Sequence, residues 1–143
     1  MNKNEIKTEI LLVSKYCSLV KQILNMHKEL SVNKMIFFAY LLKTKSNYYK
    51  LLYNANTTKD IVIKSISQIS GDYIEYCKNI PYIIEAIHLL IKNNDIIFHN
   101  SVLICKNEGK SNDVYDDKFI KKSIEESASF SDRQFLKEVL NNV

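Results

Sequence analysis

The chain has 143 residues, of which 46% are hydrophobic and 25% charged, and its formal net charge is +4. These proportions are typical of an ordinary globular protein and exclude an intrinsically disordered chain. The sequence has only two glycines and one proline. Because sandwiches and barrels need many turns built from these residues, a mainly α fold is predicted.

The excess of positive charge comes almost entirely from lysine, since Arg133 is the only arginine. Bidentate recognition of guanine favours the planar fork of arginine, so these lysines fit nonspecific phosphate contact better than base recognition. The alternative is a solvated lysine face with no nucleic-acid partner, because net charge governs solubility and steering rather than fold.

The cysteines Cys17, Cys77 and Cys105 are widely separated and form no Cys-x-x-Cys pair. They do not fit a structural zinc site, and each lies among apolar neighbours, as a buried thiol does. The N-terminus lacks the apolar segment of a signal peptide, and the longest apolar run, Met35–Leu42, is too short to span a bilayer. The sequence therefore predicts a reduced, cytoplasmic protein without a membrane segment, metal or cofactor.

The first part of the chain predicts two helices. Apolar residues spaced three and four apart predict a long helix from about Glu5 to Glu29, buried on a broad face. A second helix is expected over Lys34–Lys43, with Ser31 and Asn33 as start signals. Because this segment is apolar nearly all round, we expect it at the centre of the core.

Shorter helices are predicted in the middle of the chain. Asn47–Asn54 is a short apolar segment, and Thr57 with Asp60 can cap a helix that carries several isoleucines and ends before Gly71. The Ile-Val-Ile start of that helix also fits a strand, but the later spacing favours a helix. A further helical turn or two is expected over Asp72–Lys78.

The stretch Ile80–Lys106 is the most distinctive part of the sequence. Pro81 fits the first turn of a helix that reaches Lys92, because a missing N–H costs nothing there. Two short β-branched runs then flank His99-Asn100, which lies where a two-residue hairpin turn is expected. A helix followed closely by a hairpin is the outline of a winged helix.

Two closing helices are expected at roughly Asp117–Ser127 and Asp132–Asn141. Ser131-Asp132-Arg133-Gln134 matches a capping box, and Phe130 and Phe135 are positioned as a hydrophobic staple. The whole chain is predicted to form a single domain. Its parts are a helical region (1–79), a helix plus wing (80–106) and C-terminal helices (114–143).

No cluster of residues predicts catalysis. The histidines His27, His88 and His99 lie far apart or on different elements, and Asp116-Asp117 and Glu125-Glu126 fit helix starts and a solvated surface. The sequence has no glycine-rich phosphate loop, no Gly-x-Ser-x-Gly elbow and no His-Glu-x-x-His helix. An enzyme is therefore the least supported class.

Aromatic residues are the candidates for a partner interface. Tyr48, Tyr49 and Tyr53 form a cluster of the kind that protein interfaces use, because tyrosine is large, stiff and half polar. The same cluster fits a partly exposed core or a surface that stacks on single-stranded bases. Phe130 and Phe135 are assigned to the same interface.

A DNA-binding interpretation of the helix and hairpin stays open. In that interpretation Pro81–Lys92 enters a groove of DNA. The side chains expected to contact phosphates are Lys92, Asn100, Lys106 and Lys110. However, the polar positions of this helix include Glu85 and no arginine, so the winged element is predicted to dock a protein.

The order of elements resembles that of the small middle components of bacterial three-component ABC ATPase defence systems, of which the Lamassu type is best known. The resemblance depends on three features in this order: a helical bundle, the helix and hairpin of Ile80–Lys106, and the closing helix Phe130–Leu140. In the second of these, the apolar helix leads into Asn-Asp-Ile-Ile. The resemblance implies a non-enzymatic subunit that joins a DNA-sensing, SMC-like ATPase to an effector, often a nuclease. It implies no catalytic residues.

The sequence thus predicts an adaptor subunit of a bacterial anti-phage or anti-plasmid complex, whose partners are an SMC-like ATPase and an effector nuclease, with nonspecific DNA contact in addition. The alternative is a winged-helix DNA-binding transcriptional regulator. A third interpretation, an all-helical binding protein, treats Asp95–Cys105 as a loop.

Overall fold

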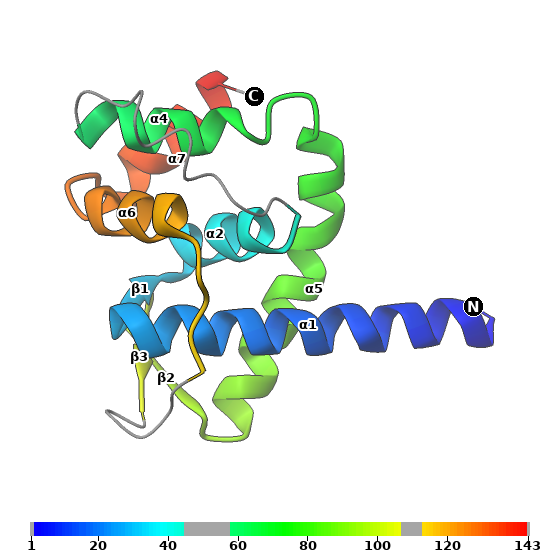
Figure 1. Cartoon of the computed structure of the whole chain (residues 1–143). Helices are drawn as coiled ribbons and strands as arrows, with labels where there is room; N and C mark the ends of the chain where they lie inside the picture. Colours follow the sequence, from blue (N-terminus) through cyan, green and yellow to red (C-terminus); the bar gives the residue numbers. More distant parts are fainter. Residues whose placement is uncertain (1, 45–57, 107–112, 143) are drawn as a thin grey trace.

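The computed structural model describes residues 2–44, 58–106 and 113–142 (Figure 1). Its helices are α1 (Lys3–His27), α2 (Val32–Thr44), α4 (Thr58–Ser67), α5 (Tyr73–Lys92), α6 (Lys118–Ser127) and α7 (Asp132–Asn142). Its strands are β1 (Glu29–Ser31), β2 (Ile96–His99) and β3 (Val102–Cys105). The prediction of a mainly α fold is confirmed. The apolar segment at Asn47–Asn54 and the cap at Thr57 lie outside the described residues.

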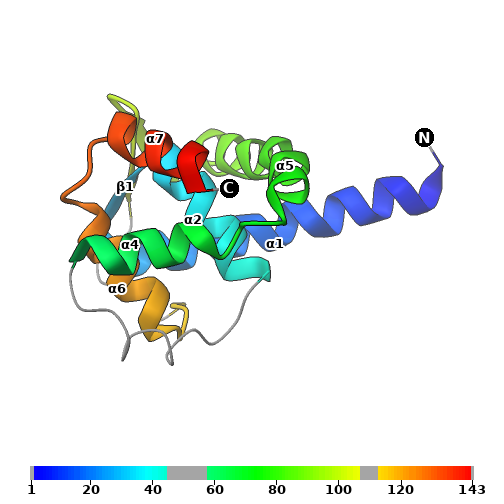
Figure 2. The same cartoon turned by 90° about the horizontal axis from the view of Figure 1, so that it is seen from above.

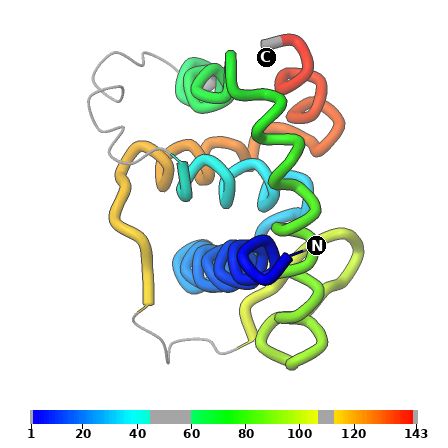
Figure 3. Tube along the Cα trace, turned by 90° about the vertical axis from the view of Figure 1, so that its right-hand side faces the viewer, coloured from blue at the N-terminus to red at the C-terminus, as the bar shows by residue number. Residues whose placement is uncertain are grey.

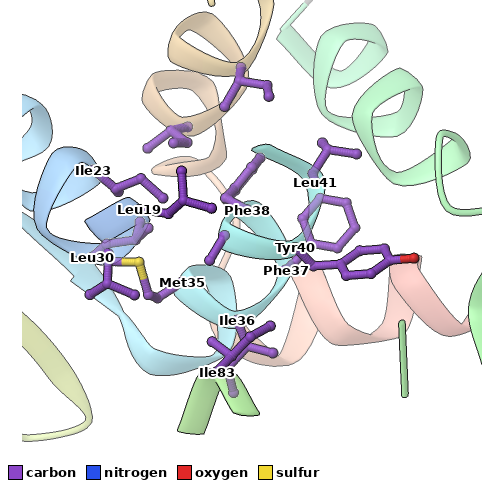
Figure 4. Close-up of a cluster of buried hydrophobic side chains, with 14 of the residues drawn as sticks. Leu19, Ile23, Leu30, Met35, Ile36, Phe37, Phe38, Tyr40, Leu41 and Ile83 are labelled. Carbon is purple, nitrogen blue, oxygen red and sulfur yellow. The ribbon is translucent and has the colours of Figure 1, made fainter. Parts of the chain in front are cut away.

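Helix α2 lies at the centre of the described fold. All side chains of residues 34–41 are buried, and Figure 4 shows them pointing to several sides, among residues of α1, β1 and α5. The ring of Phe37 meets Phe38 and Phe135 edge-on, with centroids 5.1 and 5.3 Å away. The prediction of a central helix is confirmed, because any exposed face of α2 would uncover large apolar side chains.

Lys34 is the charged residue within this buried run. Its Nζ donates hydrogen bonds to the carbonyl oxygens of Ser127, at 2.8 Å, and Phe130, at 2.7 Å. These carbonyls lie at the end of α6 and just after it, where acceptors lack helical partners and the helix dipole favours a cation. Burial lowers the pKa of Lys34, and the Asp132 carboxylate opposes this shift. Lys34 therefore joins α2 to the connection between α6 and α7.

Replacing Lys34 by methionine is expected to lower the free energy of unfolding by about 2 kcal/mol, because the Phe130 carbonyl loses its Lys34 donor and the Ser127 carbonyl loses one of its two donors, keeping the Phe130 amide. Urea unfolding followed by circular dichroism measures the effect. The control is Lys15→Met at an exposed position of α1, which should change the unfolding free energy by less than about 0.5 kcal/mol. Equal unfolding free energies for the two variants would argue against this role of Lys34.

The strands form an antiparallel sheet in the order β1-β3-β2. The predicted hairpin is confirmed, but its turn is Asn100-Ser101 and not His99-Asn100. Both turn residues have positive φ angles, 50° and 65°, as a type I′ turn requires. His99 pairs with Val102. The predicted turn was wrong by one residue, because Asn100, which tolerates a positive φ, takes the first turn position and not the second, so that His99 stays in β2.

Strand β1 is not predicted by the sequence pattern, since three residues are too few to show alternation. Leu30 of β1 pairs with Leu103 of β3. The amide of Val32 also donates to the carbonyl of Ser101 at 3.0 Å, just beyond the paired residues. The hairpin is thus part of a three-stranded sheet, and the interpretation of Asp95–Cys105 as a loop is wrong.

Helix α5 is continuous, although two separate segments were predicted on either side of Pro81. Pro81 lies inside the helix, so the expected boundary between residues 79 and 80 is wrong. Tyr76 and Ile83 are buried on the same side of α5, one before and one after the proline. We infer that their burial offsets the cost of about 3 kcal/mol for an internal proline. Cys77 and Pro81 are exposed, so water can reach the carbonyl that loses its donor.

The thiols are less buried than predicted. Cys105 is buried, Cys17 is half-buried and Cys77 is exposed, and all three are free. Cys77 and its apolar neighbours lie on α5, where only one side faces the core. An apolar neighbourhood in the sequence therefore did not establish burial for this residue.

Helix α1 begins and ends two residues earlier than predicted. At its start the Asn2 side chain accepts from the amide of Glu5 at 2.9 Å, and the Glu5 carboxylate accepts from the amide of Asn2 at 3.2 Å. This pair is a capping box. At its end Lys28 has a φ of 70°, and Glu29 enters the sheet. Figures 1 and 2 show the N-terminal part of α1 projecting beyond the other described elements.

Helix α7 begins at the predicted capping box. The amide of Gln134 donates to Ser131 Oγ at 3.1 Å, and the amide of Ser131 donates to Gln134 Oε1 at 2.9 Å. Two of the otherwise unpaired backbone donors at the helix start are thereby satisfied. The predicted capping box is confirmed. It could be predicted because it depends only on residues that are close together in the sequence.

The end of α1 is joined to the segment before α6 by His27 and Tyr115. His27 Nε2 and Tyr115 Oη are 2.5 Å apart, and the two rings stack with centroids separated by 5.9 Å. Burial lowers the pKa of His27 and raises the pKa of Tyr115. Both shifts favour a neutral His27 that accepts a hydrogen bond from the Tyr115 hydroxyl.

The stability of the protein should fall as the pH decreases below about 6.5, the value for an unfolded histidine. Folded His27 has a lower pKa, so between the two values the unfolded state binds the proton more readily. We expect His27→Gln to reduce the loss of unfolding free energy between about pH 7.5 and about pH 5.5, measured by urea unfolding. The exposed His88→Gln is the control. An unchanged pH dependence in His27→Gln would rule out this assignment.

Candidate docking surface

A groove of about 460 Å³ lies between α5, the hairpin and the start of α2. We call it the α5–hairpin groove, and Figure 3 shows the hairpin beside the lower part of α5. Its volume is within the range of pockets that hold small molecules or side chains of a partner. The residues that line it are Val32, Asn33, Ile84, Ile87, His88, Ile91, Phe98 and Ser101.

One wall of the groove is a row of isoleucines on α5. Ile84, Ile87 and Ile91 are three and four residues apart, so they lie along one side of the helix. Ile87 is only 5% exposed and belongs to the core, whereas Ile84 is 49% exposed. The row therefore begins in the core and continues onto the surface, which gives the groove an apolar wall.

The other wall comes from Phe98 on β2. Alternate residues of a strand face the same side, so Phe98 shares the core side of the sheet with Ile96. Ile96 is 4% exposed, but Phe98 lies near the turn and is 51% exposed. The ring of Phe98 is therefore held by the strand register at the edge of the core, where a partner can contact it.

The two walls are held in place by the backbone. The first residue of α2, Val32, donates its amide hydrogen to the carbonyl of Ser101 in the hairpin turn at 3.0 Å. Phe98 pairs with the fully buried Leu103 on the neighbouring strand. The groove is thus formed by elements anchored in the core, which limits the ordering entropy that binding must overcome.

The polar groups near the groove are few. His88 lines the groove, and Lys92 is exposed one turn further along α5. Glu85, also exposed, lies one turn before Leu89 on the same helix. A recognition helix for DNA presents basic or amide side chains to base edges and phosphates. From Pro81 to its end, α5 exposes Pro81, Ile84, Glu85, His88 and Leu89 along with a single lysine, Lys92.

The residues predicted to contact phosphates are not gathered into one cluster. Lys92 is exposed at the end of α5 and Asn100 is exposed in the hairpin turn. Lys106 is exposed at the opposite end of β3 from that turn, roughly 13 Å away along the strand. Lys110 lies outside the described residues.

The predicted aromatic interface needs one correction. Phe135 is fully buried, and its ring packs against Phe37 and Phe38 with centroids 5.3 and 5.7 Å away. The Phe135 side chain therefore belongs to the core, where it packs α7 against α2. Phe130 is half-buried. The remaining residues of that prediction, Tyr48, Tyr49 and Tyr53, lie outside the described residues.

Sequence reasoning did not select Ile84 or Phe98 as surface residues. Strand alternation puts Phe98 on the same side as the buried Ile96, and nothing in the sequence pattern indicates that the core ends before it. Among the residues that the structure describes there is no group of His, Cys, Asp or Glu side chains that could hold a metal ion. Within the same ranges, none of the helices combines the length and apolar content needed to cross a membrane.

Comparisons with protein-family models, with curated proteins and with solved structures found no match.

The different positions of the two phenylalanines predict different stability effects. Phe135→Ala should lower the free energy of unfolding by about 3–5 kcal/mol, since it leaves a cavity in the core. Phe98→Ala should lower it by less than about 1 kcal/mol, because half of that side chain already contacts water. Urea unfolding of both variants tests the prediction, and a similar loss for each would mean that Phe98 is a core residue.

Proposed function

We propose that this chain is a non-enzymatic adaptor subunit that binds another protein in the α5–hairpin groove. The observation that carries the proposal is the apolar character of that groove, with Ile84 and Phe98 about half exposed on its two walls. Burial of such side chains by a partner is favourable, by about 25 cal/mol for each Å² removed from water. Exposed apolar groups on rigid elements are typical of protein interaction sites.

The element order supports a winged-helix scaffold for this adaptor. The chain runs α1, β1, α2, α4, α5 and then the β2–β3 hairpin, with β1 paired to β3. In a DNA-binding winged helix, the helix before the hairpin enters the major groove. In this chain that helix carries Ile84, Glu85 and His88 at its surface, so protein binding is the better chemical fit.

The shape of the groove favours a helical partner segment. One wall is itself a helix, and its exposed or half-buried groove residues, Ile84 and Ile91, lie two turns apart. An amphipathic helix with apolar residues at i, i+3 or i+4, and i+7 fits such a groove. The same segment could place an acid near Lys92 or His88 at the rim.

The identity of the partners follows from the resemblance to the middle components of Lamassu-type defence systems. On that basis the adaptor joins an SMC-like ABC ATPase to an effector nuclease in a complex directed against phages or plasmids. It acts in the cytoplasm, and the three free cysteines fit a reducing compartment. Nonspecific phosphate contact by surface lysines is compatible with this role.

Coexpression with the neighbouring genes tests the proposal. The tagged wild-type chain should copurify with an SMC-like ATPase encoded beside it. A double variant, Ile84→Glu with Phe98→Thr, should lose at least about tenfold of the copurified ATPase. The control is Ile74→Glu, at an α5 residue that is 72% exposed and outside the groove. Undiminished copurification with the double variant would refute the groove, and absence of an ATPase partner would refute the partner assignment.

The alternative, a winged-helix transcriptional regulator, is supported by the net charge of +4 and by exposed Lys92 and Asn100 beside the hairpin. It predicts sequence-selective binding to a short duplex that weakens as salt rises and is lost in Lys92→Glu. The adaptor predicts at most nonspecific binding. Anisotropy titrations with labelled duplexes of different sequence distinguish the two functions.

A further inference from the structure

The first turns of α1 form a second exposed surface, remote from the α5–hairpin groove. The first buried residue of α1 is Val13, and Figures 1 and 2 show the preceding turns extending past the rest of the described chain. Ile6, Ile10 and Leu11 in this projecting part are 44%, 60% and 70% exposed. Three large aliphatic side chains on one short projecting segment are unusual for a surface that contacts only water.

The charges of this segment are divided between its two sides. Lys3, Lys7, Leu11 and Lys15 are spaced four residues apart and form one row, with Ile6 and Ile10 in the row beside it. We call these six residues the α1 strip. The acids Glu5 and Glu9 form the row on the opposite flank of Ile6 and Ile10 from the lysines, since Glu9 lies three residues after Ile6. The strip therefore combines aliphatic side chains with cations and contains no acid.

The acids on the other side are engaged within the chain. The Tyr82 hydroxyl of α5 donates to Glu9 Oε1 at 3.5 Å. Glu5 is the reciprocal partner of Asn2 in the capping box. The Tyr82 contact places the Glu9 side of α1 towards α5. The aliphatic residues of the α1 strip stay 44% to 70% exposed.

The projecting end is also stabilised as a helix before any partner binds. Isolated helices shorter than about 12–15 residues are marginal in water, and the capping box at Asn2 contributes about 1 kcal/mol at the free end. Continuity with the buried second half of α1 removes the cost of nucleation. A preformed helix loses less entropy on binding than a flexible tail.

We infer that the α1 strip docks an acidic amphipathic helix of a second protein. Ile6 and Ile10, one helical turn apart, with Leu11 in the next row, pack against an apolar helical stripe, and the lysines pair with acids of the partner, as flanking charges do in coiled coils. A second copy of this chain is a poor occupant, because its lysines would meet lysines while its acids Glu5 and Glu9 already bond within the chain. A lipid surface is also a poor occupant, because the strip has three aliphatic residues and no aromatic residue.

The α1 strip and the sheet lie at opposite ends of α1. With a rise of about 1.5 Å per residue, Ile10 and the end of the helix at His27 are about 25 Å apart. A partner on the strip therefore leaves the sheet end of α1 uncovered. The inference deepens the proposed function, on which it rests for the adaptor role, because an adaptor needs two separate surfaces.

Two designed peptides probe the strip on the full-length chain. Both are helical, with leucine at the a and d positions of a heptad repeat, and they carry either glutamate or lysine at the flanking positions. Fluorescence anisotropy should show binding of the glutamate peptide at least about tenfold tighter than that of the lysine peptide. The preference should weaken as the ionic strength rises.

Three variants make the result specific to the strip. A triple variant, Ile6→Gln with Ile10→Gln and Leu11→Gln, should lose binding of the glutamate peptide. Reversal of Lys3, Lys7 and Lys15 to glutamate should exchange the preference in favour of the lysine peptide. The matched control is Leu136→Gln with Leu140→Gln on α7, at residues 40% and 65% exposed, and should bind as wild type does. Because all substituted residues are exposed, the urea midpoints should stay close to that of wild type.

Several outcomes overturn the inference. Equal affinity for the two peptides, no binding of either, or an unchanged preference after charge reversal excludes the acidic helix. Strip-dependent binding to phosphatidylserine vesicles without peptide binding assigns the surface to lipid instead. A dimer in analytical ultracentrifugation that the glutamine variant abolishes assigns it to a second copy. Loss of the ATPase in the groove variant, together with any of these results, leaves the proposed function intact and removes only the second surface.

Discussion

Helix α2 has no polar side, so each element around it has to cover part of its surface. Residues 34–41 are all buried, and α1, α5, α6, α7 and β1 all contact the helix. The only charge in that run, Lys34, is satisfied by two carbonyl oxygens at and after the end of α6. The buried ammonium thereby ties α2 to the connection between α6 and α7, and Phe135 packs against α2 from α7.

The same central helix positions the surface on which the functional proposal depends. Its first residue bonds to the hairpin turn, so the sheet cannot move independently of the core. Where α5 lies beside the sheet, Ile87 is buried in the core and Ile84 is exposed on the surface. The α5–hairpin groove is therefore an extension of the core onto the surface. An apolar surface of this kind favours a protein partner over nucleic acid, since it provides few donors for phosphate or base edges.

Local features of the fold were largely predictable. The capping box at Ser131 follows from residues that are neighbours in the sequence. The central position of α2 follows from its apolar residues, which leave no side of the helix for water. Pro81 was misplaced because its position within a helix is acceptable only where buried side chains on both sides hold the helix together. The hairpin turn was misplaced by one residue, since Asn100 tolerates a positive φ at either turn position and only the strand pairing decides between them.

The sequence by itself determined the mainly helical class, the hairpin after the helix at Pro81 and the scarcity of catalytic groups. It could not distinguish Phe135 from Phe98 as core or surface, because both fit an apolar pattern. Likewise Ile6 and Ile10 continue the same three-and-four spacing as the buried residues of α1, yet they lie beyond the end of the core. Only the tertiary structure decided these cases, because the exposure of a side chain depends on which distant elements pack against it. A periodic sequence pattern does not show where those elements end.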